Sequence, residues 1–153
     1  MSYETKLQEM GLELPPAPKP VAAYIPAIRA GQFIYTSGQL PFVNGELRYQ
    51  GKVGGTVSEN EAYEAAKICA LNCLSVIKAQ LGSLDRIKQI IKVTVFVSSA
   101  PGFNKQPQVA NGASEFLFQL FGEAGQHTRS AVGVNELPLD AVVEVEMIVQ
   151  VEE

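Results

Sequence analysis

The sequence is poor in the residues that build metal sites and disulfide frameworks. Histidine occurs once, at His127, and cysteine twice, at Cys69 and Cys73. The two cysteines lie four residues apart in a segment with a strongly helical pattern, so we expect them on one helix face as small core residues. One histidine and two buried cysteines make no recognisable zinc set. The sequence therefore predicts that no metal is bound.

Long apolar runs are also missing. No run reaches the roughly 20 apolar residues that a membrane-spanning helix needs. The N-terminal stretch MSYETKLQEMG mixes both signs of charge and lacks the apolar region of a secretory signal. We therefore expect a cytoplasmic protein with no membrane partner.

Clusters of basic charge are absent as well. The chain has 12 Lys and Arg against 16 Asp and Glu, a net charge of −4, and its lysines form no stripe. Binding to nucleic acid without sequence preference depends on clustered Lys and Arg against phosphates. A nucleic-acid partner is therefore not expected.

What the sequence does contain begins with a helix and two strands. Its 153 residues suggest a single domain. We predict a short helix over residues 2–10 and an extended proline-rich run over residues 13–22. Two strands should follow, over residues 22–29 and 32–38, joined by a tight turn at Ala30-Gly31.

The next segment carries a hairpin signal and the start of a long helix. Asn44-Gly45 predicts a hairpin turn, and the GKVGG tract at residues 51–55 a flexible surface connection. Ser58 and Glu61 fit a capping box, and Gly82 is the stop signal of the helix that they begin. The buried face of this helix should carry Ala62, Ala65, Ala66, Cys69, Cys73, Val76 and Ile77.

The second half of the chain completes an α+β pattern. We predict a strand over residues 87–99, a helix over residues 109–121, and a hairpin of strands 128–134 and 141–151. Two helices then cover one face of a mixed sheet. No third helix is available for the other face, so a homo-oligomer that packs sheet faces together is the natural inference.

The stretch TRSAVG places a long cation beside very small residues. In a strand, Arg129 shares a face with Ala131 and Gly133, because side chains alternate with period two. Arg129 is either a solvated strand residue or a residue beside space that is meant for a ligand. The opposite face, which we expect to face the core, carries Ser130, Val132 and Val134.

The last strand also has two different faces. One is apolar, whereas the other carries Glu144, Glu146 and Ile148. Two glutamates on a covered face are costly unless they are paired or solvated in a cavity. The alternative is that this face is wet. The apolar face consists of Val143, Val145, Met147 and Val149.

Two motifs resemble the signatures of a known family. YTSGQLP (residues 35–41) and RSAVGVNELPLDAVVEVE (residues 129–146) are similar to those of the Rid family, the reactive-intermediate deaminases, also called YjgF-type or endoribonuclease L-PSP proteins. The resemblance begins at about Pro20, so residues 1–19 are interpreted as an N-terminal extension and 20–153 as one domain. It implies a chorismate-mutase-like fold and a homotrimer with a pocket at each subunit interface.

The resemblance also implies a chemistry, the hydrolysis of 2-imino acids to 2-keto acids and ammonia. The carboxylate-binding arginine of the family falls on Arg129 and its water-positioning glutamate on Glu144. Its tyrosine, the serine of its TSGQ motif and its helix asparagine fall on Tyr24, Ser37 and Asn111. Imine hydrolysis needs little more than positioning and one proton-transfer group, so no cofactor is expected.

The sequence departs from the family pattern beside the arginine. The cysteine often found two residues after it is Ala131 here, whose backbone carbonyl can still accept from the substrate nitrogen. The usual Pro-Ala before the arginine is His127-Thr128. His127 is interpreted as a surface or interface residue, with a place at the pocket rim as the alternative. These departures indicate a divergent subgroup with its own substrate.

Two other functions remain open from the sequence. The same pocket could hold a small carboxylate or keto acid without turnover. The family is also labelled endoribonuclease or translation inhibitor, but the acidic balance and the lack of a basic, aromatic platform disfavour that activity.

Overall fold

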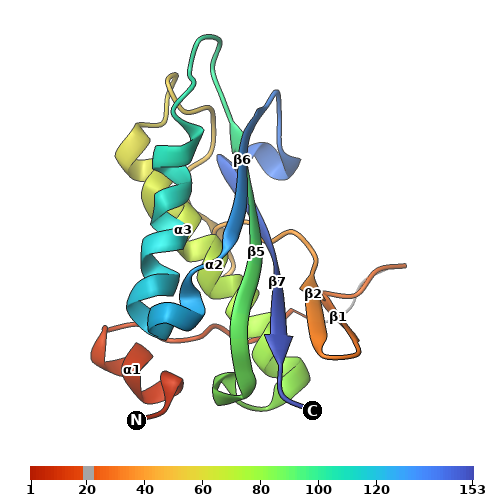
Figure 1. Ribbon diagram of the computed structural model, residues 1–153. Coiled ribbons are helices and arrows are strands. Elements are labelled where there is room, and N and C mark those ends of the chain that lie inside the picture. Colours follow the sequence, from red (N-terminus) through yellow and green to blue (C-terminus); the bar gives the residue numbers. More distant parts are fainter. Residues whose placement is uncertain (19–22) are drawn as a thin grey trace.

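A five-stranded mixed sheet runs through the protein, with its strands in the order β1-β2-β7-β5-β6 (Figure 1). The structure is a computed structural model that describes residues 1–18 and 23–153. Neighbouring strands are antiparallel except β5 and β6, which are parallel. The strands are β1 (Ala27–Ala30), β2 (Phe33–Thr36), β5 (Ile87–Ser98), β6 (Thr128–Val134) and β7 (Val143–Val151).

Helices cover one face of this sheet. The long helices α2 (Glu59–Leu81) and α3 (Gln106–Phe121) lie side by side against it, as predicted (Figure 1). The short helix α1 (Tyr3–Glu9), also predicted, packs on α3 and on a single 3-10 turn, η1 (Leu84–Arg86), and leaves the other face of the sheet open. No helix among the described residues is long and apolar enough to cross a membrane.

The start and end of α2 follow from local chemistry. Ser58 Oγ accepts a hydrogen bond from the Glu61 backbone N–H at 3.1 Å, and Glu61 Oε1 accepts one from the Ser58 N–H at 3.0 Å. Gly82 ends the helix at a φ of 85°, which a residue without a Cβ adopts at little cost. Both predicted signals are confirmed.

The two cysteines lie on the buried face of α2, as predicted. The Cys69 thiol donates to the Val143 carbonyl at 3.6 Å, and the Cys73 thiol to the Val145 carbonyl at 3.3 Å. Burial raises the pKa of Cys69 well above its usual value and that of Cys73 to about 12. Small side chains thus let α2 lie close to β7 and bond to it.

Smaller elements match the prediction in part. Asn44 and Gly45, with φ of 51° and 80°, form the predicted hairpin between β3 (Phe42–Val43) and β4 (Glu46–Leu47). The flexible connection predicted at residues 51–55 is wrong, because its one apolar residue, Val53, is fully buried and bridges to Val57 and Ser99. Two further 3-10 turns are η2 (Gly122–Gly125) and η3 (Pro138–Asp140).

The predicted hairpin of the last two strands is wrong. β6 and β7 do not pair with each other, because β5 lies between them. β5, α3 and β6 instead form a strand–helix–strand unit, and a helical crossover joins parallel strands. The first two strands are shorter than predicted, and residue 22, where the first was to begin, lies outside the described residues.

The predicted core face of β6 is also wrong. Val132 is 44% exposed on the open face of the sheet. Arg129 and Ala131 are in register with Val93 and Val95, which are fully buried on the helix side. Val132 therefore belongs to the open sheet face, whereas Ala131 faces the helices and Arg129 turns toward α3.

The N-terminal segment lies against the domain. Leu7 is buried, and Ser75 on α2 donates a hydrogen bond to the Pro15 carbonyl. Residues 12–18 have no regular structure, which fits their prolines, and residues 19–22 of the predicted run lie outside the described residues. The division of the chain at residue 19 stays a prediction.

Candidate functional site

Arg129 is held in place by two neutral side chains of α3. Its Nη1 donates to Asn111 Oδ1 at 2.8 Å and to Ser114 Oγ at 3.0 Å. The side chain is half-buried, and no carboxylate of the described residues lies within ion-pair distance of it. The positive charge is therefore available to an anion that enters from outside.

An open cleft of about 560 Å³ lies beside Arg129. His127 stands on its rim, where burial lowers the pKa of the imidazole, and the positive charge of Arg129 lowers it further. The imidazole is accordingly neutral near pH 7. The lining residues are Ser114, Phe118, Gly125, Gln126, His127 and Arg129.

Glu144 lies elsewhere, on the open face of the sheet. Its carboxyl group packs on Gly38, where an added Cβ would lie 2.7 Å from Glu144 Cδ. Burial raises the pKa of Glu144, and the neighbouring charge of Glu146 raises it further. Glu144 can therefore hold a proton more readily than an exposed carboxylate, which suits it to proton transfer.

Ser37 and Tyr24 lie near Gly38, at the same corner of the sheet. Ser37 Oγ donates to the Ile25 carbonyl at 2.7 Å and so ties the end of β2 to the residue next to Tyr24. Tyr24 is 59% exposed. The candidate residues thus form two groups, one around Arg129 with Ala131 and Asn111, and one around Glu144.

The two groups are well separated within one chain. Glu144 is in register with Phe96 and Val132 on the open face, whereas Arg129 is in register with Val93 and Met147 on the helix side. Because β5 lies between β6 and β7, Arg129 and Glu144 are two strand spacings apart, which is about 10 Å across the sheet. They also differ by three residues in register, which adds about 10 Å along the strands. One chain does not bring Arg129 and Glu144 to the same ligand.

Two residues of these groups were not predicted. Ser114 lies three residues after Asn111, so helical spacing puts both on one face of α3 and could have indicated it. Gly38 stands inside the TSGQ motif, and a Cβ at this position would force the Glu144 carboxyl group to move.

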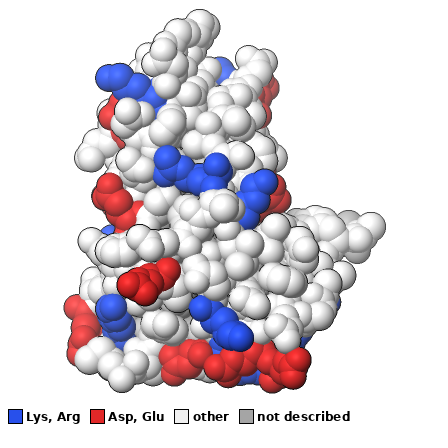
Figure 2. Space-filling model, viewed as in Figure 1, with Lys and Arg blue, Asp and Glu red and all other residues white. Residues whose placement is uncertain are grey.

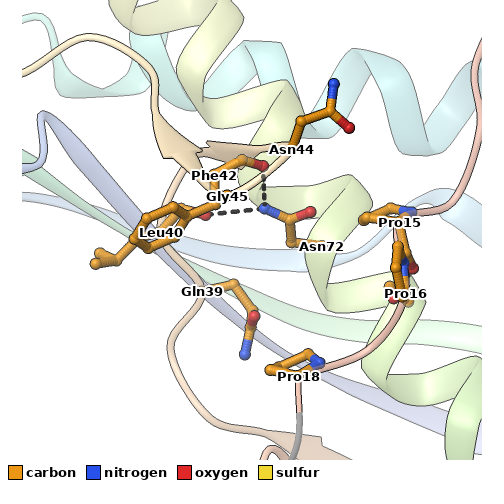
Figure 3. A pocket seen from close by; sticks show the side chains of 10 residues that line it. Pro15, Pro16, Pro18, Gln39, Leu40, Phe42, Asn44, Gly45 and Asn72 are labelled. Carbon is orange, nitrogen blue, oxygen red and sulfur yellow. Dashed lines mark hydrogen bonds between the residues drawn. The ribbon is translucent and has the colours of Figure 1, made fainter.

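A second cavity, of about 370 Å³, lies between the proline-rich segment and the β3–β4 hairpin (Figure 3). Asn72 donates there to the carbonyls of Leu40 and Phe42, at 2.9 and 3.1 Å. Its lining includes no ionisable side chain, so it offers no group to hold a carboxylate or move a proton. The Arg129 cleft is the better candidate.

Metal ligands do not gather in the part of the chain that the structure describes. No three side chains of His, Cys, Asp or Glu are placed there to hold an ion. Lys and Arg occur in small groups among acidic side chains, and no continuous basic surface covers the face drawn in Figure 2.

Comparison with known proteins identifies the family. Residues 4–151 match the family described as "YjgF/chorismate mutase-like, putative endoribonuclease". The chain belongs to this family. Protein TCP17 of Trypanosoma cruzi is 42% identical, over 94% of this chain and 91% of its own. The 2-iminobutanoate/2-iminopropanoate deaminase of Dermatophagoides farinae is 32% identical, over 92% of this chain and 95% of its own.

Solved structures of this family have the same fold. Atu1372 from Agrobacterium tumefaciens, a protein of unknown function, is 42% identical with a TM-score of 0.93, over 98% of this chain and 92% of its own. TdcF from Escherichia coli, solved with bound serine, is 26% identical with a TM-score of 0.64, over 90% of this chain and 94% of its own. The predicted resemblance and the α+β, chorismate-mutase-like fold are confirmed, whereas the homotrimer stays a prediction.

Proposed function

We propose that this protein hydrolyses 2-imino acids to 2-keto acids and ammonia. The observation that carries the proposal is Arg129, a half-buried cation that neutral side chains fix beside an open cleft. A guanidinium group holds a carboxylate through two parallel charge-assisted hydrogen bonds, which set its orientation as well as its affinity. The ligand that fits is a small acid.

Glu144 supplies the proton transfers that hydrolysis needs. Its carboxylate accepts a proton from water while the water oxygen forms a bond to the imine carbon. The resulting carboxyl group returns that proton to the nitrogen, which gives a carbinolamine. Glu144 then moves the hydroxyl proton of the carbinolamine to its nitrogen, so the carbonyl forms as the C–N bond breaks and ammonia leaves. The Ala131 carbonyl accepts a hydrogen bond from the substrate N–H, and Tyr24 and Ser37 close the pocket. This sequence of steps consumes only water and needs no cofactor.

The active site requires two copies of the chain. Arg129 and Glu144 lie on opposite faces of one sheet, so each pocket takes Arg129 from one subunit and Glu144 from its neighbour. The open sheet face offers an apolar surface for that contact, because Ile28, Tyr35 and Ile148 are in register on three adjacent strands. Ile28 and Tyr35 are 56% and 44% exposed in the single chain. A closed homotrimer covers this face in every copy.

The relatives support this chemistry. The Dermatophagoides farinae protein is named for the deamination of 2-iminobutanoate and 2-iminopropanoate. TdcF was solved with serine, a small molecule with a carboxylate and a nitrogen on its α-carbon. A 2-imino acid has the same two groups in the same positions.

Arg129 variants test the proposal. An amino-acid oxidase generates the imines in place, and their decay is followed with and without the protein. Losing a desolvated charge pair costs about 2–5 kcal/mol, so Arg129→Ala should lower kcat/KM roughly 30- to several-thousand-fold. Arg129→Lys should also fail, because a point charge does not reproduce the planar fork.

Arg48→Ala, at an exposed arginine outside the cleft, is the matched control and should keep full activity. Thermal midpoints and light scattering on the same preparations separate loss of chemistry from loss of fold. A well-folded Arg129→Ala variant with unchanged turnover would refute the assignment. Binding of 2-keto acids by a wild-type protein that accelerates no imine decay would point to a carrier without turnover.

A further inference from the structure

The Arg129 cleft combines a cation with an aromatic side chain that is only partly packed. Phe118 is 50% exposed and lines the same cleft as Arg129. The other apolar residues in the second half of α3, such as Phe116, Leu117, Leu120 and Phe121, are buried in the core. Phe118 therefore adds little to the core of the single chain, and its ring is available to a ligand in the cleft.

Helical spacing sets the distance between the two features. Asn111, Ser114 and Phe118 lie on one face of α3, since they follow one another at intervals of three and four residues. Ser114 contacts the guanidinium of Arg129. Phe118 lies one turn further on, about 6 Å along the helix axis. A carboxylate on Arg129 thus has an aromatic surface about one helical turn away.

His127 adds a second flat ring to the cleft. It lies two residues before Arg129, immediately before β6, and lines the same cleft. Its imidazole is neutral near pH 7, because burial lowers its pKa, so it offers a stacking surface without a second positive charge.

We propose that the preferred substrates are 2-imino acids with an aromatic side chain, whose carboxylate binds Arg129 and whose ring packs on Phe118 and His127. This inference rests on the proposed function and specifies its substrate class. An aryl group one methylene beyond the imine carbon spans the distance from the Arg129 end to Phe118. The methyl group of 2-iminopropanoate is too short to reach it.

The test compares imines made in place from phenylalanine, leucine and alanine by one amino-acid oxidase. A matched hydrophobic subsite is worth about 10- to 200-fold in kcat/KM, so the phenylalanine imine should exceed the alanine imine by that ratio. The leucine imine should fall between them. Phenylpyruvate should inhibit more strongly than pyruvate by a similar factor.

Variants connect the preference to the two rings. Phe118→Ala should reduce the phenylalanine-to-alanine ratio about tenfold or more, and His127→Pro should reduce it by a smaller factor. Phe42→Ala, at a partly exposed phenylalanine outside the cleft, should leave the ratio unchanged.

The outcomes separate this inference from the proposed function. If no imine is hydrolysed, the proposed function fails. If the alanine imine is hydrolysed at least as efficiently as the phenylalanine imine, only the aromatic preference fails. If kcat/KM is equal for the leucine and phenylalanine imines, the proposed packing of an aromatic side chain on Phe118 and His127 is wrong. If Phe118→Ala dissociates the oligomer, another copy of the chain covers Phe118 and the inference is wrong.

Discussion

Two inactive variants should restore each other's activity if the active site lies between subunits. Arg129 and Glu144 are on opposite faces of one chain, so Arg129→Ala and Glu144→Gln each remove a different half of every pocket. In a mixed trimer, a pocket regains both halves wherever a Glu144→Gln subunit supplies the arginine and an Arg129→Ala neighbour supplies the glutamate.

The size of the recovery follows from the symmetry. With equal amounts of the two variants, the subunit that supplies the arginine to a pocket has Arg129 intact in half of the cases. Its neighbour, which supplies the glutamate, has Glu144 intact in half of the cases. About one quarter of the pockets are therefore complete, and activity should rise to about one quarter of wild type. If each site belonged to one chain, no pocket would be complete and activity would stay at the level of the separate variants.

The assay uses co-expressed variants with two different tags, purified over both tags and sized by light scattering. Selection for mixed trimers excludes the two homotrimers, so the measured recovery should reach or exceed the random value. As a control, Arg129→Ala is combined with Arg129→Lys. No pocket of these mixed trimers contains an arginine at residue 129, so activity should not recover. Mixed trimers that are no more active than the separate variants would refute a pocket built from two copies.

Two further predictions concern stability. Burial raises the pKa of Glu144, so the folded chain holds that proton more tightly than the unfolded chain, and this contribution to stability is lost as the pH rises through the raised pKa. At pH 7 to 8, Glu144→Gln should therefore have a higher thermal midpoint than the wild type. Below about pH 4, where Glu144 is protonated in both the folded and the unfolded chain, this difference should disappear. Equal midpoints of the two proteins at pH 8 would contradict the argument. Gly112→Ala should destabilise the fold by about 1–3 kcal/mol despite its better helix propensity, because a methyl group there would overlap the Tyr63 carbonyl. Denaturant titration would show this against Gln119→Ala, an exposed site on α3 that should change little.

Local features of the fold could be predicted because short-range chemistry decides them. The capping box of Ser58 and Glu61 and the left-handed Gly82 depend on contacts within a few residues. The Asn44-Gly45 turn needs only two positive φ angles, which these residue types accept. These signals can be identified in the sequence because they do not depend on how distant parts of the chain pack.

The order of the strands could not be predicted in the same way. β6 and β7 follow each other in sequence and have the pattern of a hairpin, yet β5 separates them in the sheet. The alternation of Arg129 and Val132 gave the two faces correctly but not which of them meets the helices. That choice depends on where α3 packs, and the apolar face of β6 is the one left open.

The candidate site was predicted as a set of residues rather than as an arrangement. Arg129 and Asn111 are in contact, which residue spacing alone could not establish. Glu144 lies on the other side of the sheet. The face on which a β7 residue lies, relative to a β6 residue, depends on how both strands pair with β5, and the sequence does not give that register. The Arg129 cleft needs α3 and the start of β6 together, and those segments meet only in the folded chain.

The buried thiols have a consequence for the proposed chemistry, whose substrates are reactive electrophiles. Cys69 and Cys73 are the only two cysteines in the sequence, and both are fully buried and bonded to carbonyls on either side of Glu144. Thiolates, not thiols, attack electrophilic carbon, and the raised pKa values of both groups keep them protonated. If the proposed function is right, imines in the pocket therefore meet no competing thiolate, and the folded protein should resist inactivation by thiol-alkylating reagents.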